Sequence, residues 1–140
     1  MISKFEKSDI DAIIKLGEKI NPGFKKLFKP NELPINEQIY VYKNEGDILA
    51  FLHVLINIDA LEILNLIVEE NSRQQGIATL LIDHLLSDPE LNQRCWILEV
   101  RASNQAALNL YEKFNFYPIN TRKNYYGDED AVVLERSNDL

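Results

Sequence analysis

Strand-like and helix-like segments alternate in the middle of the chain, and this order limits the fold more than any other feature of the sequence. The runs "LEILNLIVEE" (61–70) and "CWILEVRA" (95–102) are short and apolar, as in buried strands. Between them, apolar residues recur with a helical period and predict a helix over about 74–87. A strand, a helix and a strand in succession are typical of an α+β domain.

The flanking segments add strands and helices to this unit. "SDIDAIIKLGEKI" predicts a helix over 8–20, with Ser8 as its cap. Residues 37–44 and 47–56 flank Glu45-Gly46 and predict a hairpin, and later segments predict a helix over 103–114 and strands over 116–126 and 129–136. No repeat or flexible linker interrupts the chain, so residues 1–140 are predicted to form one domain.

Composition excludes several classes of protein. No apolar run approaches the roughly 20 residues of a membrane-spanning helix, and charged residues interrupt the N-terminal apolar stretches, so we expect a cytoplasmic protein with no membrane partner. The net charge of -7 disfavours nucleic acid and suits a basic protein or an amine. Cys95 is the only cysteine, which excludes a disulfide framework and a multi-cysteine metal site; no metal is expected.

A polar turn, "EENSRQQG" (69–76), precedes the central helix. The first N–H groups of a helix have no partner within it and carry partial positive charge, so this turn suits an anion. Gly76 would let a ligand approach the backbone, and Arg73 adds a cation. The lysine of a P-loop and the three glycines of a dinucleotide fingerprint are missing. The alternative is that Gly76 only relieves crowding between helix and strand.

Glu99 is the residue that most needs an explanation in the strand "CWILEVRA". Alternation places Cys95, Ile97, Glu99 and Arg101 on one face and Trp96, Leu98 and Val100 on the other. A carboxylate in a buried strand is costly unless something pairs with it. One interpretation is an ion pair with Arg101. The other is a carboxylate that opens into a cleft and accepts a proton, directly or through water.

Two residues of the following helix are further candidates. Tyr111 shares a helix face with Ala107, Leu110 and Phe114, which predicts that it points to the core. A core tyrosine bonded to a backbone carbonyl is its simplest interpretation. Asn104 stands at the start of the helix, where asparagine is a common cap.

Two segments together resemble a known superfamily. Arg73-Gln74-Gln75-Gly76-Ile77-Ala78 resembles the acetyl-CoA signature of the GNAT N-acetyltransferases, Gln/Arg-x-x-Gly-x-Gly/Ala. "LEVRASNQAALNLYEKFNF", with the later "RKNYY" and "EDAVVLER", looks like the more specific pattern of the RimI branch, whose members acetylate the N-terminal alanine of a ribosomal protein. The resemblance covers about residues 61–136.

This resemblance implies a mixed sheet of about seven strands, with helices on both faces and a splayed strand pair that forms an acetyl-CoA cleft. It implies Glu99 as general base and Tyr111 as general acid. The cofactor contacts that it implies fall on a bulged and splayed strand, on the turn, and on the cap of the later helix: Leu66, Ile67, Val68, Arg73, Gln74, Gln75, Gly76, Ile77, Ala78, Thr79 and Asn104.

The reaction implied is direct attack of an amine on the thioester of acetyl-CoA, without a covalent acyl-enzyme. The basic N-terminus of a protein, in the first place a ribosomal protein, is the expected acceptor. The N-terminal third departs from the RimI pattern, because "NPGFKKLFKPNELPINE" (21–37) replaces its usual proline–tryptophan–serine segment. A lysine or a small amine is therefore the alternative acceptor, and a non-catalytic acyl-CoA-binding module is the alternative function.

Overall fold

The fold is that of a computed structural model, which describes residues 1–29 and 32–137. Its strands are β1 (Ile2–Lys4), β2 (Glu37–Asn44), β3 (Asp47–Ile56), β4 (Ala60–Val68), β5 (Cys95–Arg101), β6 (Tyr117–Arg122) and β7 (Ala131–Arg136). Its helices are α1 (Ile10–Ile20), α2 (Phe24–Leu27), α3 (Ile77–Leu86), α4 (Pro89–Asn92) and α5 (Gln105–Lys113), with short 3-10 turns η1 (Lys7–Asp9) and η3 (Glu70–Ser72). The predicted α+β class is confirmed.

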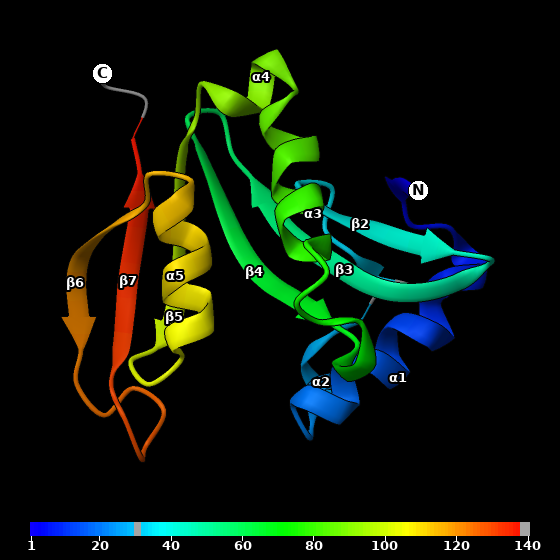
Figure 1. The fold of residues 1–140 in the computed structure, drawn as a ribbon, viewed down its shortest axis with the longest axis horizontal. Coiled ribbons are helices and arrows are strands. Elements are labelled where there is room, and N and C mark those ends of the chain that lie inside the picture. The colour runs from blue at the N-terminus through cyan, green and yellow to red at the C-terminus, as the bar shows by residue number, and fades with distance from the viewer. Residues whose placement is uncertain (30–31, 138–140) are drawn as a thin grey trace.

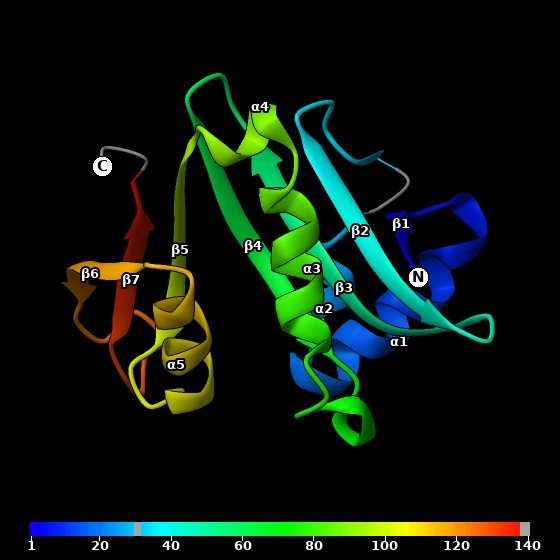
Figure 2. The same cartoon turned by 45° about the horizontal axis from the view of Figure 1, so that its top comes forward.

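All seven strands form one mixed sheet in the order β1-β2-β3-β4-β5-β7-β6. Among the strands of the described residues, only β4 and β5 pair in parallel, and α3 and α4 supply the crossover between them. Their pairing lasts for three rungs and ends at Glu62↔Ile97. Beyond this rung the two strands diverge, as Figures 1 and 2 show, so the predicted splayed pair is confirmed.

A β-bulge lies on β4 just after the strands separate. His53 of β3 is opposite Asn65, whereas the next residue, Val54, is opposite Ile63, so Leu64 is the extra residue. A bulge bends its strand and increases the local twist, which favours divergence from β5. The resemblance placed the bulge over Leu66–Val68; in the structure it comes slightly earlier.

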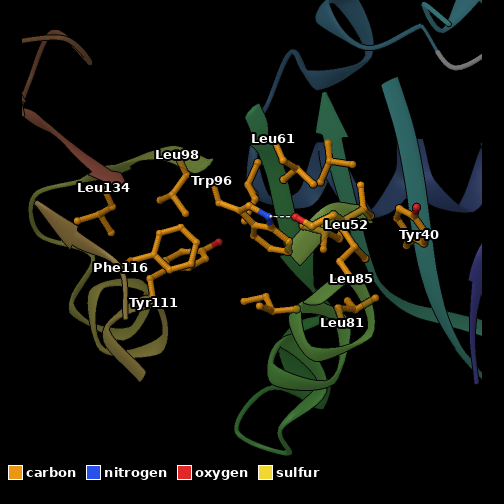
Figure 3. Packing of buried hydrophobic residues seen from close by; sticks show 14 of the residues in the cluster. Tyr40, Leu52, Leu61, Leu81, Leu85, Trp96, Leu98, Tyr111, Phe116 and Leu134 are labelled. Carbon is orange, nitrogen blue, oxygen red and sulfur yellow. Dashed lines mark hydrogen bonds between the residues drawn. The ribbon is translucent and has the colours of Figure 1, made fainter. Parts of the chain in front are cut away.

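Apolar residues cover the two faces of the sheet differently. Helices α3 and α5 pack on one face over a large core that contains Leu52, Leu61 and Trp96. Figure 3 shows how this core runs from α5 to α3 across the divergence. Helices α1 and α2 pack on the other face, over a second core. This core joins Ile13 of α1 and Phe28, which follows α2, to buried apolar residues of β2, β3 and β4. The helices thus lie on both faces, as predicted.

Local predictions succeeded in the hairpin and failed at one cap. The β2–β3 turn has positive φ at both Glu45 and Gly46, which suits a two-residue hairpin turn. Ser8, predicted as the cap of α1, lies inside η1 instead. Asp9 precedes α1, and its carboxylate accepts the Glu6 N–H at 2.8 Å. Within the described ranges, no helix is long and apolar enough to cross a membrane.

Candidate active site

A cavity of about 440 Å³ opens where β4 and β5 separate. Its walls come from both diverging strands, from β6 and β7, and from the loop between the last two strands. The lining residues are Glu62, Ile63, Leu64, Ile97, Leu98, Glu99, Arg122, Tyr125, Tyr126 and Val133. The cavity is large enough for the end of a peptide or a small amine.

Glu99 faces this cavity from β5. The burial of β5 alternates as predicted, with Trp96, Leu98 and Val100 buried and the Glu99 side chain 25% exposed. Its carboxylate forms an ion pair with the guanidinium of Arg122 on β6, with Nε and Oε1 3.1 Å apart. The predicted partner, Arg101, was wrong. An ion pair therefore stabilises Glu99, and the cavity also gives it access to a ligand.

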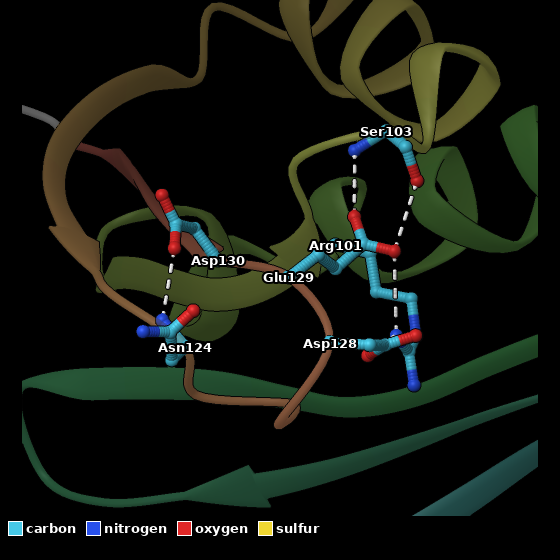
Figure 4. A network of polar contacts seen from close by, with 6 residues as sticks. All are labelled: Arg101, Ser103, Asn124, Asp128, Glu129 and Asp130. Atoms are coloured by element: carbon cyan, nitrogen blue, oxygen red, sulfur yellow. Dashed lines mark hydrogen bonds and ion pairs between the residues drawn. The ribbon is translucent and has the colours of Figure 1, made fainter.

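Arg101 belongs instead to a polar network at the far end of β5. Its guanidinium contacts Asp128 at 3.0 Å and Glu129 at 3.3 Å, and Glu129 also accepts the N–H and hydroxyl of Ser103. The network, drawn in Figure 4, ties the β6–β7 loop to the start of α5. The Arg101 guanidinium also lies 4.3 Å from the centre of the Tyr126 ring, so it helps to hold one wall of the cavity.

Tyr111 approaches β5 from the opposite face. It is 4% exposed and packs edge-on against Phe116, with ring centres 5.2 Å apart, in the core that contains Leu98. The predicted core orientation is confirmed, but its hydroxyl makes no hydrogen bond to another described residue, so the predicted backbone-carbonyl partner is not found. In Figure 3 the hydroxyl points toward the side of the core that holds Trp96. Burial raises the pKa of Tyr111, so the phenol stays protonated.

Asn104 caps α5, as the sequence predicted. Its side-chain oxygen accepts the N–H of Ala107 at 3.1 Å. The cap uses the Oδ1 atom and leaves the side-chain N–H groups without a partner among the described residues. The side chain is thereby oriented, and its donors are available to a ligand.

The last residues of β4 present a backbone edge with no neighbouring strand. Leu66, Ile67 and Val68 pair with β3 on one side, while β5 has already diverged on the other. In an antiparallel pair, alternate residues direct their N–H and C=O groups away from the partner strand. This edge therefore suits a ligand with amide groups. Arg73 reaches back to it and donates from Nε to the Val68 carbonyl at 3.1 Å.

The turn before α3 has the geometry of an anion site. Gln74, with φ 64°, and Gly76, with φ 80°, have left-handed backbone, and Gln74, Gln75 and Gly76 are exposed. Gly76 precedes α3 without a side-chain cap, and the first intrahelical bond is donated by Leu80. The N–H groups of Ile77, Ala78 and Thr79 are thus unpaired within the helix.

Gly76 does not relieve crowding. A Cβ built at this residue would meet nothing within 4 Å, so the alternative explanation from the sequence is wrong. The space above Gly76 is open to a ligand, and its positive φ separately favours glycine. No group of three or more His, Cys, Asp or Glu side chains among the described residues is arranged to hold a metal ion.

The predicted residues thus lie in three places around the divergence. Glu99 faces the cavity, Tyr111 lies on α5 and Asn104 at its cap, and the other predicted cofactor contacts lie along the β4 edge and the turn before α3. Sequence reasoning assigned no role to four cavity residues: Glu62, Arg122, Tyr125 and Tyr126. The "RKNYY" segment contains three of them, but only the strand order brings it to Glu99.

Comparisons with known proteins agree with this geometry. The acetyltransferase (GNAT) domain family matches residues 36–118, and the chain therefore belongs to the GNAT acetyltransferases. It is 33% identical to the [ribosomal protein bS18]-alanine N-acetyltransferase of Escherichia coli K12, over 95% of this chain and 94% of that protein. This similarity extends well beyond residues 61–136, where the sequence patterns placed it.

Solved structures resemble the fold along its whole length. The crystal structure of the ribosomal-protein-S18-alanine N-acetyltransferase from Escherichia coli has a TM-score of 0.86 and 28% identity, with coverage of 100% of this chain and 97% of that one. A GNAT family acetyltransferase from Elizabethkingia anophelis, solved with acetyl-CoA bound, has a TM-score of 0.77 and 20% identity, with coverage of 98% and 97%. The second likeness concerns the fold alone.

Proposed function

We propose that this chain transfers the acetyl group of acetyl-CoA to the N-terminal α-amine of a protein, in the first place a ribosomal protein. One observation carries the proposal: a cavity lined by Glu99 opens at the point where β4 and β5 diverge, while Tyr111 approaches the same divergence from the other face. The similarity to an enzyme that acetylates the alanine of ribosomal protein bS18 supports this acceptor.

The residues present fit acetyl-CoA, which supplies an activated thioester. The unpaired amides of Ile77–Thr79, with the open space at Gly76, suit a diphosphate, and Arg73 adds a positive charge beside them. The free edge of β4 over Leu66–Val68 suits the amides of the pantetheine arm. Asn104 has side-chain donors to offer to the same arm.

Glu99 has the position of a general base. An α-amine has a pKa of about 7.7 to 8.0, so it is partly neutral at physiological pH and needs to lose one proton to become a nucleophile. The Glu99 carboxylate can accept that proton, directly or through water. Until then, the ion pair with Arg122, whose Nε lies 3.1 Å from Oε1 of Glu99, keeps the carboxylate oriented.

Tyr111 has the properties of a proton donor to the departing sulfur. Its hydroxyl is protonated across the physiological range, and it makes no bond to another described residue that it would first have to break. The ring is fixed by Phe116 and the surrounding core. A positioned donor of this kind contributes about 100-fold or more to a rate.

A lysine or small amine is the alternative acceptor. A lysine side chain has a pKa near 10.4, so it is almost wholly protonated at neutral pH. Its proton is therefore harder for the base to remove than that of an α-amine. A ribosomal acceptor implies that the protein acts in the cytoplasm.

Release of free thiol from acetyl-CoA in the presence of peptides tests the activity, and it separates an enzyme from a module that only binds acyl-CoA. Three peptides suffice: one with a free α-amine, the same peptide with its α-amine blocked and a lysine added, and one with both groups blocked. We expect release only with the first. If thiol is released only with the second peptide, the acceptor is a lysine side chain and not an α-amine. In cells, loss of the gene should remove an N-terminal modification of about 42 daltons from a ribosomal protein.

A further inference from the structure

We propose that Glu62 is a specificity-determining residue, which selects acceptors that carry a permanent positive charge next to the reacting amine. This inference rests on the proposed function, because it concerns the acceptor in the same cavity. In this proposal, Glu62 binds the cationic side chain of a lysine or arginine at the second residue of the acceptor.

Glu62 occupies the closed end of the divergence between β4 and β5. It forms the last rung with Ile97, and parallel partners direct their side chains to the same face of the sheet. Glu99 lies two residues after Ile97 and so shares this face. Both carboxylates line the cavity, Glu62 from β4 and Glu99 from β5. Its neighbours Leu61 and Ile63 are buried, whereas Glu62 is exposed to the cavity.

The charges around the cavity leave Glu62 as its unpaired carboxylate. Three lining residues are charged: Glu62, Glu99 and Arg122. Arg122 is committed to Glu99, and the nearby Arg101 is committed to Asp128 and Glu129. Glu62 makes no ion pair with any residue that the structure describes. The lining therefore carries one net negative charge, and that charge is on Glu62.

Glu62 could bind either the reacting amine or a cationic side chain of the acceptor, and the fate of each charge during the reaction distinguishes them. A carboxylate that paired with the reacting ammonium would stabilise its protonated form and oppose the proton loss that the reaction requires. A cation on the next residue keeps its charge throughout the reaction, so binding to it has no such cost. Successive Cα atoms are about 3.8 Å apart, which puts a second side chain within reach when the first amine is at Glu99.

The cavity walls also suit a long cationic side chain. Tyr125 and Tyr126 line it, and their rings can pack against an aliphatic stem. Both rings already have a guanidinium nearby: Arg122 lies 5.4 Å from the centre of the Tyr125 ring, and Arg101 lies 4.3 Å from that of Tyr126. An incoming cation therefore finds its free counter-charge at Glu62 rather than at these rings.

The test is a series of short peptides that differ only at the second residue, which is Arg, Lys, Gln or Glu. For the unaltered protein we expect kcat/KM to be about two- to fivefold higher with Arg or Lys than with Gln, the scale of one partly exposed charge pair, and lowest with Glu. Glu62→Gln should bring the Arg-to-Gln ratio close to one, and Glu62→Lys should reverse it. Glu112→Gln, an exposed carboxylate on α5 outside the cavity, is the matched control and should keep the preference.

Different outcomes overturn different claims. If no peptide with a free α-amine is acetylated, the proposed function itself is wrong. If peptides are acetylated but Glu62→Gln keeps the preference for Arg, the inference about Glu62 is wrong and the function stands. If Glu62→Gln instead changes the pH profile equally for all four peptides, Glu62 acts on the reacting amine, which also overturns the inference.

Discussion

The two halves of the sheet, which part at the β4–β5 divergence, are built for different tasks. Strands β1–β4 have helices on both faces, with α3 on one and α1 and α2 on the other, and they contain fully buried side chains such as Phe51 and Leu52. Strands β5–β7 have α5 on one face only, and their other face opens to the cavity and carries Glu99. Figure 1 shows the two halves side by side.

The two halves therefore contribute differently to stability and to chemistry. Apolar contact on two faces supplies most of the free energy of folding in the first half. In the second half, the polar network around Arg101 ties the β6–β7 loop, which lines the cavity, to β5 and to the start of α5. A face without a covering helix is the face where a substrate can reach a carboxylate.

Phe51→Ala, in the doubly covered half, should reduce the free energy of unfolding by about 3–5 kcal/mol, because it leaves a cavity in a fully buried site. Tyr117→Ala on the edge strand β6 removes an aromatic side chain from the other half for comparison. This aromatic residue is 45% exposed, and we expect its loss to cost much less. Denaturant unfolding of both variants measures the effect. Equal costs would contradict the division of stability between the halves.

Tyr111→Phe should lower turnover by about 100-fold or more, since it deletes only the proposed proton donor. The ring keeps its packing against Phe116, and the lost hydroxyl has no hydrogen bond to another described residue, so the unfolding midpoint should barely change. Tyr117→Phe is the same substitution at a tyrosine 45% exposed on the edge strand β6, away from the core that holds Tyr111, and it should leave turnover unaltered. Near-normal turnover in Tyr111→Phe would remove the residue from the mechanism.

Glu99→Gln should lower kcat/KM by about 100-fold near pH 6, where the acceptor amine is mostly protonated. The loss should shrink as the pH approaches 8, the region of the amine's own pKa, because less proton removal is then needed. Rates with one peptide between pH 6 and 9 measure this. A deficit of equal size at every pH would show that Glu99 orients the acceptor through its pair with Arg122 and does not accept its proton.

Gly76→Asp should abolish the stabilisation that CoA gives to the protein, about 2.7 kcal/mol at a concentration of 100 times the Kd. Gly46→Asp is a closely matched control. Both glycines have positive φ, and an added Cβ at either would meet nothing within 4 Å, but Gly46 lies in the β2–β3 turn. The two variants should therefore share the backbone strain and differ in their response to CoA. If folded Gly76→Asp were still fully stabilised by CoA, the diphosphate site would not be at Gly76.

The smallest expected effect is a loss of order in the β6–β7 loop at acidic pH. The Arg101 guanidinium lowers the pKa of Asp128, and the Ser103 N–H and hydroxyl lower that of Glu129. A depressed folded-state pKa stabilises the folded loop at pH values above the ordinary carboxyl range, and this contribution is lost as the pH falls below about 4. The protection of the amides of residues 124–130 against hydrogen exchange, relative to the intrinsic exchange rate at each pH, should fall only in that acid range. In Arg101→Gln the Asp128 titration, followed by carboxyl NMR, should move to higher pH; an unchanged midpoint would contradict the assigned cause.

Much of the fold followed from local pattern. The hairpin bounds, the helix over 103–114 with its buried Tyr111, and the alternation of β5 all appear in the structure, because the periods of strand and helix depend on the backbone of the segment itself. The sequence patterns missed β1, α2 and α4, which have only three or four residues each, too few for a period to show.

The site divides in the same way. Local sequence pattern was enough to predict that Glu99 shares a face with Ile97, that a helix begins after the turn at Gly76, and that Asn104 caps the next helix. The pairing of Glu99 with Arg122 rather than Arg101, and the presence of Glu62 in the same cavity, became visible only in the folded structure. The physical reason is that these contacts join strands far apart in the chain, so they depend on strand order and on the divergence of β4 from β5, which no local period encodes.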